Sequence, residues 1–226
     1  MSTTILVLAS KEAPMARIAT LLTLACLSLV PAQSDSLAQS ALSFPNTNIA
    51  LHSVRQVYQL LVGFEISSDV TLENTPIELD LSGMDEASAF DAIVKQRTGY
   101  VWNMENGIYN FYPKRQNDSL SQLIIGNFVV TDATFRDIQS ALFNQPEVRE
   151  WLRLHHAIRS GLINSTAAMP PKGAPVPEPK KISLNLRNMQ LRLILNQVIS
   201  KLGTDQWIIG HVAAKGQFAE YVSIEF

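Results

Sequence analysis

The chain has 226 residues, a formal net charge of −2 and 46% hydrophobic residues, values that are ordinary for a globular protein. The near-neutral charge balance, without a basic stripe, argues against a nucleic-acid-binding surface, because contact with a phosphate backbone needs clustered Lys and Arg. The length suits two small domains or one elaborated domain.

Residues 1–32 have the pattern of a secretory signal peptide. Arg17 precedes an apolar run over residues 18–30, and small residues follow it. The run is too short for a membrane span, which needs about 20 apolar residues, and no later segment qualifies. Cys26, the single cysteine, offers an alternative in which the chain is an outer-membrane lipoprotein. We expect an exported, periplasmic protein with an unstructured lead over residues 33–44.

Residues 45–115 predict a first small module. A short extended stretch over residues 47–51 is followed by Ser53, which pairs with Gln56 as a capping box and should begin a helix. Gly63 is expected to end that helix, and a strand should follow it.

The second part of this module has clearer signals. Residues 77–82 alternate apolar and polar side chains, which predicts a strand with one solvent-facing side. A helix should begin near Asp85, where acidic residues favour the first turn. The Asn-Gly pair at 106–107, between the aromatic-rich runs 100–104 and 108–112, indicates a β-hairpin.

Residues 120–226 predict a second, related module. Asp132 or Thr134 should cap its first helix. An inserted helical segment is expected over residues 146–160, because a proline suits a first helical position. The proline-rich stretch 169–179 cannot form helix or central strand, so we expect an extended connector there.

The second module repeats part of the first at a constant offset of 105 positions. Asn188 should cap a helix that Gly203 ends, and the runs 207–212 and 218–226 should form paired strands. The alternating strand recurs at the same offset, with Ile77, Leu79 and Leu81 matched by Ile182, Leu184 and Leu186. The expected fold class is α+β: two small modules, each with helices packed on short mixed or antiparallel sheets.

Four segments in order carry a family resemblance: IELDLSG (77–83), EASAFDAIV (86–94), Thr98-Gly99, and YVWNMENGIYNFYP (100–113). In order and spacing, residues 45–113 resemble the short N-terminal domain shared by secretins and TonB-dependent receptors, the STN domain. Residues 122–226 resemble it loosely. The resemblance implies a βαβ–βαβ-type fold used for protein contacts, in ring assembly or in signalling.

Candidate catalytic and metal-binding residues are few. His155 and His156 are adjacent, so on a helix they point about 100° apart and do not readily share one metal ion. His155 lies on an apolar stripe, which favours a hydrogen-bonded core histidine. Glu78 and Asp80 share a strand face that is typical of a solvated surface. No nucleophile motif or phosphate-binding loop is present, so we expect no enzymatic activity, cofactor or metal.

The hairpin aromatics are the candidate partner-binding residues. One face of the hairpin should be core, and the other could present rings to a partner. The expected function is therefore non-enzymatic protein binding in an envelope assembly, or self-association. The alternatives are a small-ligand carrier that binds between the modules, or a hydrolase that uses the His155/His156 region. The candidate set comprises Tyr100, Trp102, Tyr109, Phe111 and Tyr112.

Overall fold

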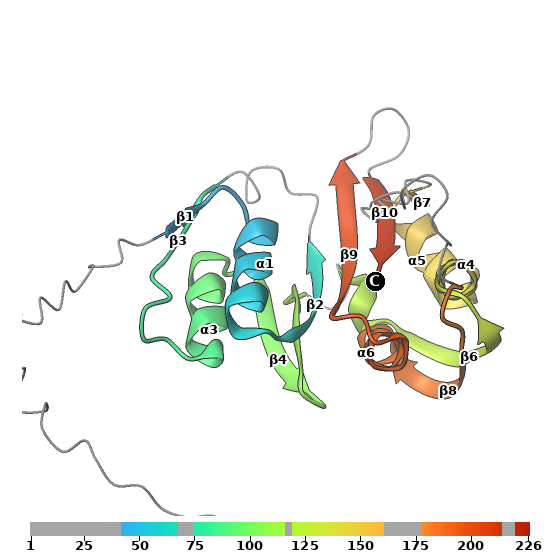
Figure 1. The fold of residues 1–226 in the computed structure, drawn as a ribbon. Helices are drawn as coiled ribbons and strands as arrows, with labels where there is room; N and C mark the ends of the chain where they lie inside the picture. Colours follow the sequence, from blue (N-terminus) through green and yellow to red (C-terminus); the bar gives the residue numbers. More distant parts are fainter. Residues whose placement is uncertain (1–41, 67–74, 116–118, 161–177, 214–219) are drawn as a thin grey trace, which may run out of the picture. The chain divides into compact units, whose positions relative to one another are not determined.

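A computed structural model describes residues 42–66, 75–115, 119–160, 178–213 and 220–226. All of these residues belong to one compact unit, Gln39–Phe226. The predicted α+β class is confirmed, with helices beside mixed and antiparallel sheets (Figure 1). The predicted signal peptide, the lead up to residue 41 and most of the proline-rich connector lie outside the described residues.

The first half of the described chain, up to residue 115, has seven elements in the order β-α-β-β-α-β-β. They are β1 (Leu42–Phe44), α1 (Thr47–Tyr58), β2 (Leu61–Ile66), β3 (Ile77–Leu79), α3 (Glu86–Gln96), β4 (Tyr100–Glu105) and β5 (Ile108–Pro113).

The second half, from residue 119 on, follows a similar order, preceded by a short 3-10 helix and with one more α-helix. Its elements are η2 (Leu120–Gln122), β6 (Ile124–Ala133), α4 (Phe135–Phe143), α5 (Pro146–Leu154), β7 (Ala157–Arg159), β8 (Ile182–Gln190), α6 (Leu191–Leu202), β9 (Gln206–Ala213) and β10 (Glu220–Glu225).

Strand pairing follows one plan in both halves. The first and third strands of each half form a separate antiparallel pair, β1 with β3 and β6 with β8. The other three strands lie in the orders β4-β5-β2 and β9-β10-β7, and each set has one antiparallel and one parallel pairing. The two sets are joined into a single six-stranded sheet because β2 pairs with β9. The division of the chain into two modules stays a prediction.

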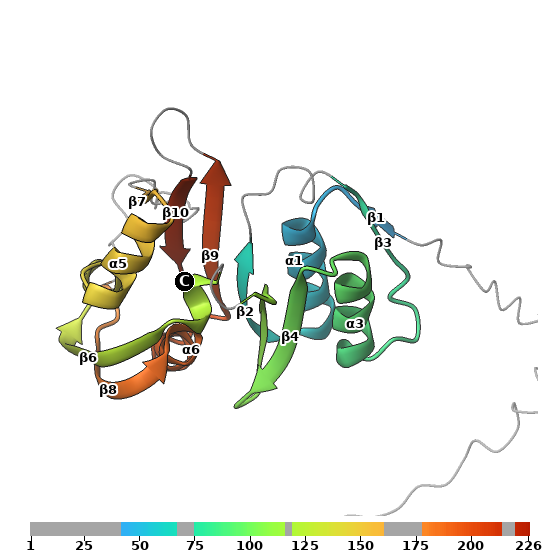
Figure 2. The same ribbon diagram turned by 180° about the vertical axis from the view of Figure 1, so that it is seen from behind.

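Each half has its own hydrophobic core. The first core packs β2, β3 and β5 against α1 and α3, which lie side by side in both views (Figures 1 and 2). The second core packs β6, β8, β9 and β10 against α4, α5 and α6. Val62 and Phe64 of β2 enter the first core, whereas Trp207 and Ile209 of β9 enter the second. Since these strands pair in register, the two cores lie on opposite faces of the shared sheet.

Most of the local signals read from the sequence are confirmed. Asp85 caps α3 and accepts a hydrogen bond from the Ser88 N–H at 2.7 Å. Thr134 and Asp137 form a reciprocal capping box at α4, and Pro146 occupies the start of α5. Gly203 ends α6 in the left-handed conformation.

The β4–β5 hairpin is also confirmed. Asn106 and Gly107 both have positive φ, 55° and 78°, as a tight turn between strands of right-handed twist requires. The predicted alternation in residues 77–79 is present too, with Ile77 and Leu79 buried on either side of exposed Glu78.

Three expected helix boundaries are wrong. The helix assigned to begin at Ser53 begins at Thr47, because Asn46 caps it through a side-chain hydrogen bond from the Ile49 N–H. It ends at Tyr58 with Gln59 in the left-handed conformation, so Gly63 belongs to β2 and is not a helix stop. Asn188 does not cap a helix either. It lies inside β8 with φ 48°, and α6 begins three residues later.

The internal repeat includes a hydrogen bond that occurs once in each half. The Trp102 indole donates from β4 to the Asp91 carboxylate of α3 at 2.7 Å. The Trp207 indole donates from β9 to the Asn196 amide oxygen of α6, also at 2.7 Å. Donor and acceptor are shifted by the same 105 positions as the alternating strands. β9 therefore corresponds to β4, and α6 corresponds to α3.

We expect Trp207→Phe to destabilise the protein by about 2 kcal/mol, because it would leave the buried Asn196 oxygen without a donor. Trp102→Phe breaks the same bond where Asp91 stays exposed to water, and should change the free energy of unfolding by less than about 1 kcal/mol. Urea unfolding of the two variants provides the measurement. Equal losses of unfolding free energy in the two variants would contradict the difference in burial between Asn196 and Asp91.

Candidate functional site at the β2–β9 junction

The two halves meet where β2 pairs with β9, and we call this pairing the β2–β9 junction. The strands are parallel, with Val62 opposite Gln206 and Ile66 opposite Gly210. A parallel pairing between edge strands is the geometry by which one protein adds a strand to the sheet of another. Here, both strands belong to the same chain and are about 145 residues apart in sequence.

A close contact between Gly63 and Trp207 lies at the centre of the junction. These residues are opposite each other, and the Trp207 indole covers the Gly63 backbone. A Cβ atom added at Gly63 would lie 2.0 Å from Cε2 of that ring, far inside van der Waals contact. Trp207 itself is fully buried. The junction therefore requires glycine at position 63, because only a missing side chain leaves room for the ring.

Gly63→Ala should destabilise the protein by about 2 kcal/mol or more, since the ring must move out of a packed core. Gly99→Ala is the matched control. Its Cβ would meet nothing within 4 Å and its φ is not positive, so we expect a change within about 0.5 kcal/mol. Thermal and urea unfolding would measure both. A Gly63→Ala protein as stable as the control would show that the junction is not tightly packed.

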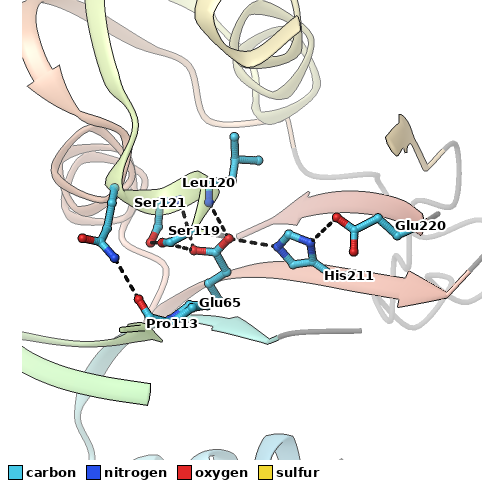
Figure 3. Close-up of polar contacts among 8 residues, drawn as sticks. Glu65, Pro113, Ser119, Leu120, Ser121, His211 and Glu220 are labelled. Carbon is cyan, nitrogen blue, oxygen red and sulfur yellow. Dashed lines mark hydrogen bonds and ion pairs between the residues drawn. The ribbon is translucent and has the colours of Figure 1, made fainter. Parts of the chain in front are cut away.

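A buried carboxylate, Glu65, lies two residues further along β2 (Figure 3). It accepts hydrogen bonds from the Leu120 N–H at 2.6 Å, the Ser121 N–H at 3.0 Å and the Ser119 hydroxyl at 2.6 Å. It also contacts Nε2 of His211 at 2.9 Å. Its charge thus lies at the N-terminus of η2, where backbone N–H groups favour an anion.

His211 of β9 bridges two carboxylates. Its Nε2 faces Glu65, and its Nδ1 lies 3.0 Å from the Glu220 carboxylate of β10 (Figure 3). Burial favours the neutral imidazole, but hydrogen bonds to Glu220 and Glu65, and their charges, raise the pKa of His211 to about 9. Burial would likewise raise the pKa of Glu65, yet the hydrogen bonds from His211, Ser119 and Ser121 lower it below its usual value. At neutral pH both residues of the contact are therefore charged.

We call Glu65, Ser119, Leu120, Ser121, His211 and Glu220 the Glu65 cluster. Its properties are those of a structural network of hydrogen bonds and ion pairs. Both Glu65 oxygens accept two hydrogen bonds each, and both His211 nitrogens have partners. Glu65 is fully buried, so its carboxylate does not meet solvent or a substrate. The Ser119 hydroxyl donates to the carboxylate, unlike a nucleophilic serine, which donates to an imidazole. The cluster joins β2, η2, β9 and β10.

The stability of the protein should fall as the pH rises from about 6.5 through 9. Below pH 6.5 the imidazole is protonated in both the folded and the unfolded chain, so the full contribution of the contact is present. Above pH 6.5 the unfolded chain releases its imidazole proton before the folded chain does. Up to about 3 kcal/mol of the free energy of unfolding is therefore lost. Urea midpoints between pH 6 and pH 9.5 would measure this loss.

Glu65→Gln removes the charge that faces His211, so that variant should be less stable at pH 6 and show a flatter pH dependence. His156→Asn is the control, because His156 is exposed with a φ of 50°, which Asn tolerates. It should retain the pH dependence of the unaltered protein. A Glu65→Gln variant with an undiminished pH dependence would refute the role of the contact.

A second ion pair connects the halves on the same side of the sheet. Arg192 of α6 donates from Nε and Nη2 to the two oxygens of Glu105 at the end of β4, at 3.1 and 3.0 Å. The guanidinium also lies over the Tyr112 ring of β5, 5.0 Å from its centre. Arg192 is buried, and α6 thereby covers one side of the β4–β5 hairpin.

The five predicted partner-binding aromatics lie in different environments. Tyr100 and Phe111 are buried and stacked on each other in the first core, and Tyr112 is buried beneath Arg192. Trp102 and Tyr109 keep part of their surface exposed, and both pack on Phe90 of α3. Both faces of the hairpin are therefore covered, because α3 lies on one side and α6 on the other. The partner-binding role of these residues stays a prediction.

The other predicted candidates do not converge. His155 is half-buried, stacks on Trp151, and its Nδ1 lies 2.8 Å from the Trp151 carbonyl oxygen, whereas His156 is exposed. Two acids of the same half are held in ion pairs, Glu150 with Arg153 and Asp132 with Lys181. Glu78 and Asp80 are both exposed. Within the described ranges, no group of three or more His, Cys, Asp and Glu side chains is placed to hold a metal ion.

A hollow of about 370 Å³ lies between η2 and α5. Its wall is mostly apolar and includes Trp151, a buried residue whose indole N–H has no hydrogen-bond partner. Leu154 and Ile124, both more than half exposed, also line it. The full set of lining residues is Ser119, Gln122, Leu123, Ile124, Trp151, Leu154 and His155.

β4 forms one edge of the six-stranded sheet. In the described residues, β4 pairs only with β5. The Lys114 N–H donates to the Gly99 carbonyl, and antiparallel hydrogen bonds alternate along a strand. Val101, Asn103 and Glu105 therefore bond to β5, while Trp102 and Met104 direct their N–H and C=O groups outward. Met104 is 58% exposed at this edge.

Comparison with family models, with curated proteins and with solved structures found no match in any of the three. No helix in the described part of the chain is long and apolar enough to cross a membrane.

Proposed function

We propose that this chain is an exported, non-enzymatic protein-binding module of a bacterial envelope assembly, and that it binds its partner by adding a strand to β4. The signal-peptide pattern of residues 1–32 supports export to the periplasm, and the likeness of residues 45–113 to the STN domain supports a role in protein contacts. Lipidation at Cys26 remains the alternative route to the envelope.

The observation that carries this proposal is the open edge of β4 in a chain that already uses strand addition internally. β9, the counterpart of β4 in the second half, has its outer edge covered by β2. β4 has the same hydrogen-bonding geometry and lacks such a neighbour among the described residues. Unpaired edge strands readily pair with other chains unless they are short, charged or blocked by proline. β4 has six residues, no proline and one charged side chain.

One observation favours the small-ligand carrier as a second candidate. The hollow between η2 and α5 has an apolar wall and a buried indole N–H, on Trp151, without a partner. A small apolar ligand with one hydrogen-bond acceptor would match that wall. The described residues that line the hollow all belong to the second half, whereas the sequence had suggested ligand binding between the modules.

Met104→Pro tests the strand-addition function. Proline removes the outward N–H of Met104 and leaves the β5 pairing intact, because that N–H does not bond to β5. Capture of envelope proteins should be lost with Met104→Pro and retained with Met104→Ala, which keeps the backbone donor at the same position. Unfolding curves would establish that both variants are folded. Equal capture by both variants would refute binding at this edge.

A further inference from the structure

We propose that the strand received by β4 carries a glycine opposite Trp102, flanked by apolar residues, as Gly63 is flanked by Val62 and Phe64 in β2. This inference rests on the proposed strand addition and names the sequence chemistry of the partner. It assigns to the β4 edge a specificity that backbone pairing alone does not provide, because main-chain hydrogen bonds are nearly independent of sequence.

Trp102 and Trp207 occupy equivalent positions in the repeat. Each follows, by eleven positions, the helix residue that accepts its indole hydrogen bond, Asp91 for Trp102 and Asn196 for Trp207. Both bonds are 2.7 Å long and connect the same two elements of the repeat. Two side chains fixed by the same bond to equivalent helices leave their strands in the same direction.

The two indole rings differ in how far they are buried. Trp207 lies over Gly63 of the neighbouring strand and is fully buried in the second core. Trp102 contacts Phe90 and Tyr109 on its inner side but remains partly exposed, and its hydrogen bond to Asp91 is exposed as well. No described strand lies beside β4 to cover Trp102 as β2 covers Trp207. The outer edge of β4 thus corresponds to the edge of β9 in the β2–β9 junction, but no described strand occupies the place of β2.

The β2–β9 junction indicates which side chains a strand beside β4 would carry. At the junction the incoming strand is parallel to the one that carries the tryptophan, and any side chain opposite the ring would clash with it. On either side of Gly63, Val62 and Phe64 point to the face opposite Trp207, where they enter the first core. The partner is accordingly an extended segment with an apolar-glycine-apolar pattern. Its glycine lies opposite Trp102, and its two apolar side chains point to the other face of the sheet, beside Val101 and Asn103 of β4.

The sharpest probe is the β2 sequence itself, because it fits the equivalent edge. A labelled peptide with the sequence LVGFEI, residues 61–66, and soluble flanks would be titrated into the full chain, alongside a matched peptide with valine in place of glycine. We expect the valine peptide to bind at least about tenfold more weakly, as overpacking against a fixed ring predicts. The glycine peptide should bind the Met104→Ala protein equally well and fail to bind Met104→Pro.

Trp102→Ala completes the design as a double-mutant cycle. With the ring removed, the two peptides should bind about equally, because the clash no longer exists. Equal binding of both peptides to the unaltered protein, lost in Met104→Pro, would overturn the glycine requirement and leave the proposed strand addition standing. Binding that survives Met104→Pro would place the peptide away from β4 and overturn both. Absence of binding by either peptide would also overturn the inference, while capture of envelope proteins would still test the function separately.

Discussion

The parallel pairing of β2 with β9 is the interaction on which the rest of this structure depends. It joins two three-stranded sheets into one, and it places their two cores on opposite faces. Gly63 allows the strands to approach because the Trp207 ring occupies the space of a side chain. Glu65 then anchors η2, which follows the first half, to His211 of β9. The two halves are thereby connected by backbone, packing and charge at one place.

The charge arrangement at the junction has a structural consequence beyond stability. A fully buried carboxylate is strongly unfavourable unless it is paired and hydrogen-bonded, and Glu65 has four hydrogen bonds in the folded chain. Separation of β2 from β9 would remove the imidazolium contact and leave the remaining charge poorly compensated. The cluster therefore favours one register of the strands over slipped alternatives, in which Glu65 and His211 would not meet.

The repeat relates this closed junction to the open edge of β4. Both tryptophans are held by an equivalent hydrogen bond, yet among the described residues only the strand of Trp207 is paired on its outer side. A chain built from duplicated units with edge strands leaves one edge of the same kind unpaired at the end of the sheet. Among the described residues that edge pairs with no other strand, whereas the hairpin faces are covered by α3 and by Arg192 of α6. This geometry is the basis of the proposed binding function.

The sequence by itself determined the features that depend on neighbouring residues: the caps at Asp85 and Thr134, the hairpin turn at Asn106, the α+β class and the 105-residue repeat. These are predictable because side-chain-to-backbone bonds and hydrophobic periodicity act within a few positions. Only the tertiary structure decided that Gly63 and Glu65 belong to the junction. Their partners, Trp207 and His211, are about 145 residues away, and no local pattern specifies which distant edges will pair.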